Sequence, residues 1–165
     1  MSLKKPGQKD LDSFYDAART GDNEHIEKFL KEYGTNFIDT ADIRGYTALM
    51  WAAWLDRPET VALLLDNGAF IDQKDNVGQT VLMGAAMNGR LDTVALLLKR
   101  GADFTLVDKY DSTAAMYARN NDHHHIAELI EKHRETLIKD SLAKGTTRPL
   151  PYKGPIIKSK KPKFP

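Results

Sequence analysis

A block of 33 residues occurs twice in this chain, and it constrains the fold more than any other feature of the sequence. The segment from Thr47 to Gln79 aligns without a gap with the segment from Thr80 to Ser112, and fifteen aligned positions are identical. A further step of 33 residues reaches Thr113, and a backward step of 35 residues reaches Asp12. Repeats of this length predict a solenoid, in which each small unit buries its apolar face against its neighbours.

Each unit carries the signals for two helices. Good N-cap residues stand where the first helix is expected to begin, at Asp12, Thr47, Thr80 and Thr113. Alanine pairs keep this first helix thin, at 17–18, 52–53 and 85–86. Apolar residues at helical spacing predict the second helix, at Ile26, Phe29 and Leu30, then Val61, Leu64 and Leu65, then Val94, Leu97 and Leu98, then Ile126, Leu129 and Ile130.

Glycines and aspartates divide the units. Gly68 and Gly101 are expected to end the second helices, because a left-handed cap favours a residue without a Cβ atom. The segments 42–45 and 75–78 begin with Asp and end with Gly, which predicts type I turns. The sequence therefore predicts a turn, a short helix, a second turn and a longer helix in each unit.

These segments resemble the ankyrin-repeat family. The resemblance rests on Gly45–Ala53, on Val61–Leu65 with Gly68-Ala69, and on the same residues 33 positions later. It covers about residues 10–133 in four units, at 10–44, 45–77, 78–110 and 111–133. It implies an all-α solenoid of helix-turn-helix units with β-turn fingers, preceded by a flexible basic segment at 1–9.

The chain departs from the family pattern at two kinds of position. The family's Thr-Pro-Leu-His is replaced by Thr-Ala-Leu-Met at 47–50 and by Thr-Val-Leu-Met at 80–83, so the loop hydrogen bonds of that histidine cannot form. Asp56 and Asp122 stand where Gly21 and Gly89 stand in other units. Because Asp tolerates left-handed geometry better than most residues, we expect slight strain there and no change of fold.

The last helix is predicted to continue through residues 134–144 and to stop at Gly145, because neither Gly nor Pro interrupts 123–144. Residues 145–165 form a Pro/Lys-rich tail with six basic residues and no acidic one. The whole chain has a formal charge of only +1, so with the basic ends removed the body at 10–133 carries −9. An acidic body repels a phosphate backbone, which argues against nucleic-acid binding except weakly through the tail.

The sequence offers little chemistry for catalysis. It contains no cysteine, no Gly-x-Ser-x-Gly motif and no phosphate-binding loop. His124 and Glu128 are four residues apart on a predicted helix, but no His-Glu-x-x-His motif completes a metal site, and a solvated first turn explains them better. We therefore expect no enzyme activity, no metal and no other cofactor.

The resemblance implies that the turn tips and one side of the first helices bind another protein. Trp51, Trp54 and Leu55 are spaced i, i+3 and i+4, which places them on one helical face. With them, the predicted partner-binding residues are Ile43, Arg44, Tyr46, Val77, Met87, Asn88, Arg90, Lys109, Tyr110 and Asn120. Tryptophan and tyrosine dominate the energetics of protein interfaces.

The same residues have a packing interpretation. Gly84 is the counterpart of Trp51 in the next unit, and its missing side chain leaves room for the Trp51 indole. For Trp54 and Leu55 we expect an exposed position and a binding role.

The favoured function is protein recognition by occupancy, through a one-to-one regulator or inhibitor that is itself a monomer. An inhibitor of this kind could protect its host from an enzyme. The alternative function is binding of nucleic acid or an anionic surface through the basic tail. No apolar run is long enough to span a membrane. Met1-Ser2-Leu3 is typical of an expression-vector remnant, so the cytoplasm and the periplasm both stay open. The resemblance to short bacterial members of the family, some of them exported, favours the periplasm.

Overall fold

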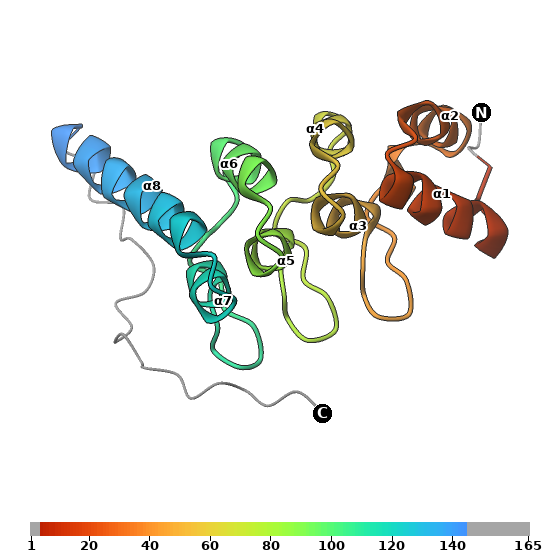
Figure 1. Ribbon diagram of the computed structural model, residues 1–165. Helices are drawn as coiled ribbons and strands as arrows, with labels where there is room; N and C mark the ends of the chain where they lie inside the picture. The colour runs from red at the N-terminus through yellow and green to blue at the C-terminus, as the bar shows by residue number, and fades with distance from the viewer. Residues whose placement is uncertain (1–3, 145–165) are drawn as a thin grey trace.

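The computed structural model describes residues 4–144, and every regular element in this range is helical. The helices form four antiparallel pairs that stack side by side (Figure 1). Their bounds are α1 Gln8–Thr20 and α2 Asn23–Tyr33, α3 Ala48–Trp54 and α4 Pro58–Asp66, α5 Val81–Met87 and α6 Leu91–Lys99, and α7 Ala114–Asn120 and α8 His124–Ala143, with the short 3-10 helix η1 at Thr35–Phe37. The tail at 145–165, with all that the sequence predicts for it, lies outside the described residues.

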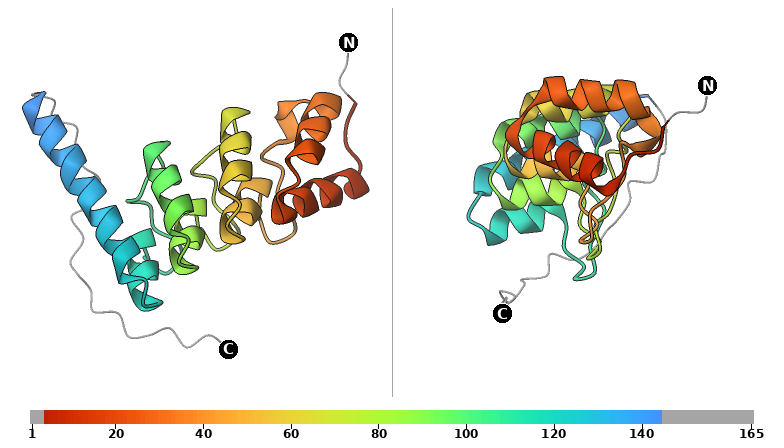
Figure 2. Two further views of the ribbon diagram at one scale, coloured as in Figure 1. Left: turned by 45° about the horizontal axis from the view of Figure 1, so that its top comes forward. Right: turned by 90° about the vertical axis from the view of Figure 1, so that its right-hand side faces the viewer.

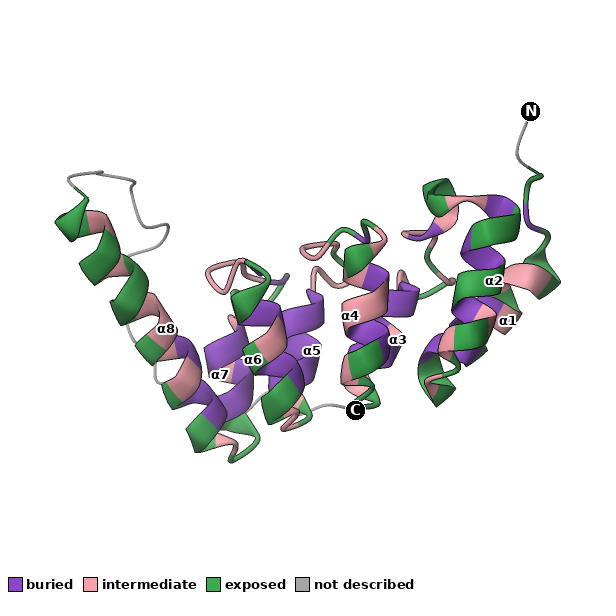
Figure 3. Cartoon of the chain, turned by 90° about the horizontal axis from the view of Figure 1, so that it is seen from above, coloured by how far each residue is buried: buried purple, intermediate pink, exposed green. Residues whose placement is uncertain are grey.

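The stack has two layers. The first helices α1, α3, α5 and α7 form one row, and the second helices α2, α4, α6 and α8 form the other. The three segments that join one pair to the next project beyond the row of first helices (Figure 2). The core lies between the layers and between neighbouring pairs, where Figure 3 shows the buried helix faces.

Alanines make the close stacking of the first helices possible. Ala52, Ala53, Ala85 and Ala86 are all fully buried. Larger residues of the same helices, Leu49 and Leu82 among them, fill the space between the layers. The repeated Leu and Ala positions of the sequence are therefore the positions at which one pair meets the next.

The caps agree with the sequence at three of the four pairs. The hydroxyl groups of Thr47, Thr80 and Thr113 accept hydrogen bonds from the backbone N–H groups of the third helical residues, Met50, Met83 and Met116. At Thr80 the cap is doubled, because the Met83 sulfur accepts the Thr80 N–H at 3.4 Å. The Met83 thioether thus adds a second capping contact beside that of the Thr80 hydroxyl at the start of α5.

The prediction that Asp12 begins the first helix is wrong. Helix α1 starts a full turn earlier, at Gln8, because the Asp10 carboxylate accepts the backbone N–H of Gly7 at 2.8 Å. Asp12 lies inside the helix, where its carboxylate accepts from the Gln8 side chain.

The left-handed positions follow the prediction. Gly68 and Gly101 stand just past α4 and α6 with positive φ angles. Asp56 and Asp122 have φ angles of 57° and 62°, so aspartate does occupy the left-handed conformation that Gly89 adopts at the same place. The hydroxyl of Thr93 donates to the Asp56 carboxylate at 3.1 Å, which gives that aspartate a second structural role.

Helix α8 continues the fourth pair without a break and ends at Ala143. Its first half packs on the stack through Ile126, Ala127 and Ile130, whereas its second half is largely exposed.

Replacing Thr113 tests the capping of α7. Thr113→Ala removes the hydrogen bond to the Met116 N–H and is expected to lower the free energy of unfolding by about 1 kcal/mol. Thr113→Ser keeps the hydroxyl and should lose clearly less. Urea denaturation measures both, and equal losses would show that the methyl group, not the cap, stabilises this helix.

Candidate functional site

Hydrogen bonds join the turn tips into one continuous edge. In each turn an aspartate oxygen accepts two backbone N–H groups, from Arg44 and Tyr46 at Asp42 and from the matching residues at Asp75 and Asp108. The Asn76 N–H donates to the Arg44 carbonyl at 3.2 Å, and the Lys109 N–H donates to the Val77 carbonyl at 3.0 Å. The tips are therefore held relative to one another as well as internally. We call these tips and the adjoining side of α1, α3, α5 and α7 the inner face.

The tips expose large apolar side chains. Ile43 is 96% exposed and Tyr110 is 68% exposed, and Val77 between them is half-buried. Lys109 is exposed, but its ammonium group donates to the Asn76 carbonyl at 2.6 Å, so it helps to join the turns. Contiguous exposed apolar patches mark interaction sites, and Ile43, Val77 and Tyr110 stand on consecutive tips of one hydrogen-bonded edge.

Three aromatic rings cluster where the first turn meets α3. The Tyr46 ring lies 5.4 Å from the Trp51 ring and 4.5 Å from the Trp54 ring, and the two indoles are 5.9 Å apart, all in edge-to-face arrangements. Leu55 follows at the end of α3 and is 39% exposed. The structure thus brings together four of the predicted binding residues.

The indole that covers Gly84 is Trp54, not Trp51. A Cβ atom built at Gly84 would overlap the Trp54 indole nitrogen, so the two are in direct contact. That nitrogen is buried and has no hydrogen-bond partner among the described residues. The contact with Gly84 expected for Trp51 is therefore made by Trp54, and the expected exposed position of Trp54 is wrong, because this residue is half-buried. Trp51 is also half-buried and packs against the core.

The remaining predicted residues have structural contacts of their own. Met87 is half-buried against the core, and the Asn88 amide donates to the Gly84 carbonyl at 2.8 Å. The Arg90 guanidinium donates to the Trp54 carbonyl at 3.2 Å. Asn120 is exposed on the fourth pair, at the far end of the inner face.

Two features of the inner face involve Arg19 and Tyr117, first-helix residues that the repeat alignment places on the groove side but that lie outside the predicted set of binding residues. The Arg19 guanidinium carbon lies 4.6 Å from the centre of the Trp51 ring, and the Arg44 carbon lies 4.9 Å from it. The sequence signal for Arg19 is its repeat position near the end of α1, but this position does not predict a contact with Trp51 of the next unit. The second feature is Tyr117, the counterpart of Trp51 and Gly84, whose hydroxyl donates to Asp108 at 2.5 Å and accepts from Gln79 at 2.7 Å.

Burial affects the ionisation of two inner-face phenols, Tyr46 and Tyr117. It raises the pKa of Tyr46, and the negative charge of Asp75 adds to the shift. Burial and the hydrogen bond to Asp108 raise the pKa of Tyr117. The shifts move both phenols further from ionisation, and a phenol with its ordinary pKa of about 10 is already protonated at neutral pH.

A family model described as ankyrin repeats in three copies matches residues 5–75 and 71–140, which is most of the chain. The chain belongs to the ankyrin-repeat family. Members of this family generally serve as protein–protein interaction modules. A comparison with curated proteins found no match.

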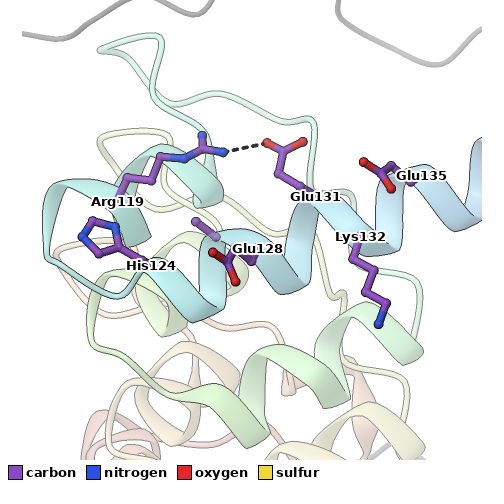
Figure 4. A pocket seen from close by; sticks show the side chains of 7 residues that line it. Arg119, His124, Glu128, Glu131, Lys132 and Glu135 are labelled. Carbon is purple, nitrogen blue, oxygen red and sulfur yellow. Dashed lines mark hydrogen bonds and ion pairs between the residues drawn. The ribbon is translucent and has the colours of Figure 1, made fainter.

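A hollow of this ankyrin-repeat protein lies on the fourth helix pair, beside α7 and the N-terminal part of α8. Arg119, His124, Glu128, Glu131, Lys132 and Glu135 line it together with Ala127. Figure 4 shows charged groups of both signs here, with Arg119 paired to Glu131 at 3.3 Å. No group of three or more potential metal ligands occurs within residues 4–144, so His124 and Glu128 gain no third partner there.

The described helices include none that is long and apolar enough to cross a membrane.

Gly84 and Trp54 offer a direct test of the packing. Trp54→Ala is expected to lower the free energy of unfolding by about 2 kcal/mol or more, because it removes a large side chain from a tight contact. Gly84→Ala should also destabilise, since its methyl group displaces the indole. In the Trp54→Ala background, Gly84→Ala should instead raise the free energy of unfolding, because alanine favours a helix over glycine by about 1 kcal/mol.

Urea denaturation of the two single variants and the double variant measures this coupling. Leu55→Ala is the control at an exposed neighbour and should cost less than about 1 kcal/mol. Additive losses at 54 and 84 would contradict the contact between the indole and Gly84.

Proposed function

We propose that this protein is a one-to-one regulator or inhibitor that binds another protein through its inner face. Family membership supports protein binding in general. The observation that carries the finer proposal is the combination of Ile43 and Tyr110, largely exposed on tips that backbone hydrogen bonds join to their neighbours. Binding to a surface that is already ordered loses little conformational entropy.

The proposed contact surface is the set of residues predicted from the sequence. Ile43, Tyr110 and Leu55 supply exposed apolar area, and Arg44 and Lys109 supply positive charge at the tips. Trp51, Tyr46 and Val77 contribute half-buried surface beside them. Trp54, Met87, Asn88 and Arg90 act mainly through the shape that they give to this surface, and Asn120 extends it to the fourth pair.

Action by occupancy follows from what the inner face offers. Its proposed contact residues are mainly aromatic, aliphatic and positively charged, which suits contact with a protein surface. A partner covered in this way is blocked or held in place, which is why we favour a regulator or inhibitor over a large scaffold.

The two exposed tips give the decisive variant. Affinity capture from the source cells with the Ile43→Ala/Tyr110→Ala protein is expected to lose a partner that the wild type retains, while the melting temperature stays within a few degrees because both side chains are exposed. The matched control is Phe70→Ala/Leu142→Ala, which removes two exposed apolar residues elsewhere and should retain the partner. Sedimentation of the purified complex should give one copy of each chain.

The tail is tested in the same capture as the second candidate function. A full-length variant with the six basic residues of 145–165 changed to glutamine should still bind the partner. If the Ile43→Ala/Tyr110→Ala protein still captured the partner and the variant with the glutamine-substituted tail did not, the proposal would be overturned in favour of binding through the tail.

A further inference from the structure

The Trp51 ring is in contact with two guanidinium groups, which belong to different parts of the chain. Arg19 belongs to α1, and Arg44 belongs to the turn before α3. Their guanidinium carbons lie 4.6 Å and 4.9 Å from the centre of the Trp51 ring, and the Arg44 carbon is also 4.8 Å from the Tyr46 ring. These contacts fix both charged groups at one place on the inner face.

Both guanidinium groups keep donors for another molecule. Their side chains are 49% and 56% exposed, so water and a partner can reach them. Each has one carboxylate nearby, Asp16 at 3.5 Å and Asp42 at 3.6 Å. These separations exceed the 2.7–2.9 Å of a charge-assisted hydrogen bond. Asp42 is moreover committed through its other oxygen to the backbone of its own turn.

The charge of the surroundings makes this pair distinctive. The body at 10–133 carries a formal charge of −9, yet Arg19 and Arg44 place two positive charges on one indole. The arginine fork matches the two oxygens of a carboxylate, and stacking reduces the freedom that the side chains lose when they bind one. The exposed Ile43 and Leu55 lie next in sequence to Arg44 and Trp54, and they add apolar contact area.

We infer that Arg19 and Arg44, held on Trp51, form a carboxylate clamp for an acidic segment of the partner protein. This inference rests on the proposed function, since it names the partner's chemistry at the same inner face. The segment contains aspartate or glutamate beside apolar residues. The chain's own tail at 145–165 is unsuited to the clamp by charge, because it has six basic residues and no acidic one.

Peptide selection tests the clamp without knowledge of the partner. A random twelve-residue peptide library is selected on the immobilised full-length protein, and the peptides that bind are measured in solution by Trp fluorescence. Trp51 and Trp54 are the two tryptophans of the chain, so the signal reports on this cluster. Selected peptides are expected to be enriched in aspartate and glutamate.

The variants separate position from net charge. Arg19→Gln/Arg44→Gln should weaken binding of the selected peptides by about tenfold or more, since each charged hydrogen bond is worth about that factor. Arg100→Gln/Arg134→Gln is the matched control. These two arginines also pair with one carboxylate each, Arg100 with Asp66 and Arg134 with Glu131. Within residues 4–144, neither of them stacks on an aromatic ring. The control should bind within about twofold of the wild type. Arg19→Lys/Arg44→Lys keeps the charge but loses the fork, and it should restore only part of the affinity.

The outcomes distinguish this inference from the function on which it rests. Peptides that need Ile43 and Tyr110 but show no acidic enrichment, and that bind the Arg19→Gln/Arg44→Gln variant normally, would overturn the clamp and leave the inner face as a protein-binding surface. Selected peptides that bind the Ile43→Ala/Tyr110→Ala variant normally would count against the inner face itself. If inorganic phosphate displaced the selected peptides and free glutamate at the same concentration did not, the ligand of the clamp would be a phosphorylated group instead. If the protein self-associated and lost this association in the Arg19→Gln/Arg44→Gln variant, the ligand would be a second copy of the chain.

Discussion

Every helix pair in this protein needs its neighbour in order to bury an apolar face. The first helices are only seven residues long in the second, third and fourth pairs, and too short to be stable alone. Fully buried alanines let them approach closely, and Leu49, Leu82 and Leu64 fill the space behind. Since stacking uses the sides of the pairs, the turn tips, the inner side, the outer side of the second helices and the two ends stay accessible to other molecules. The proposed contact surface is thus one of the surfaces that the packing of the core leaves open.

The three turn aspartates show how a repeated framework acquires differences. One oxygen of each accepts the same two backbone groups, which shapes the turn. The second carboxylate oxygen has a different environment in each turn. That of Asp42 lies near Arg44, and that of Asp108 accepts a hydrogen bond from Tyr117. That of Asp75 is buried and has no partner among the described residues. At Asp75 the position of Tyr117 is taken by Gly84 and the Trp54 indole. Among the described residues, the second turn therefore lacks the side-chain hydrogen bond that Tyr117 gives to the third.

The sequence predicts the backbone of this fold well and the side-chain contacts across its joints poorly. The 33-residue repeat predicts where the helices, the threonine caps and the left-handed residues lie, because each of these features depends on residues that are only a few positions apart. Asp12 was misplaced as a cap because the first unit departs from that spacing and Asp10 captures the start of α1. Which indole covers Gly84 depends on how far Trp54 reaches into the next pair, and the arginine contacts of Trp51 join three segments. The periodicity within one unit predicts neither the contact between Trp54 and Gly84 nor the contacts between Trp51 and the arginines.

The inner face therefore exists only in the assembled stack. Arg19 comes from the first pair, Trp51 from the second, and Arg44 from the turn between them, whose carbonyl is held by Asn76 of the next turn. Separating any two of these pairs would dismantle the arrangement even if each helix stayed formed. The same nearest-neighbour contacts that stabilise the solenoid thus also position its charged and aromatic groups, so that stability and the proposed recognition surface depend on the same contacts between pairs.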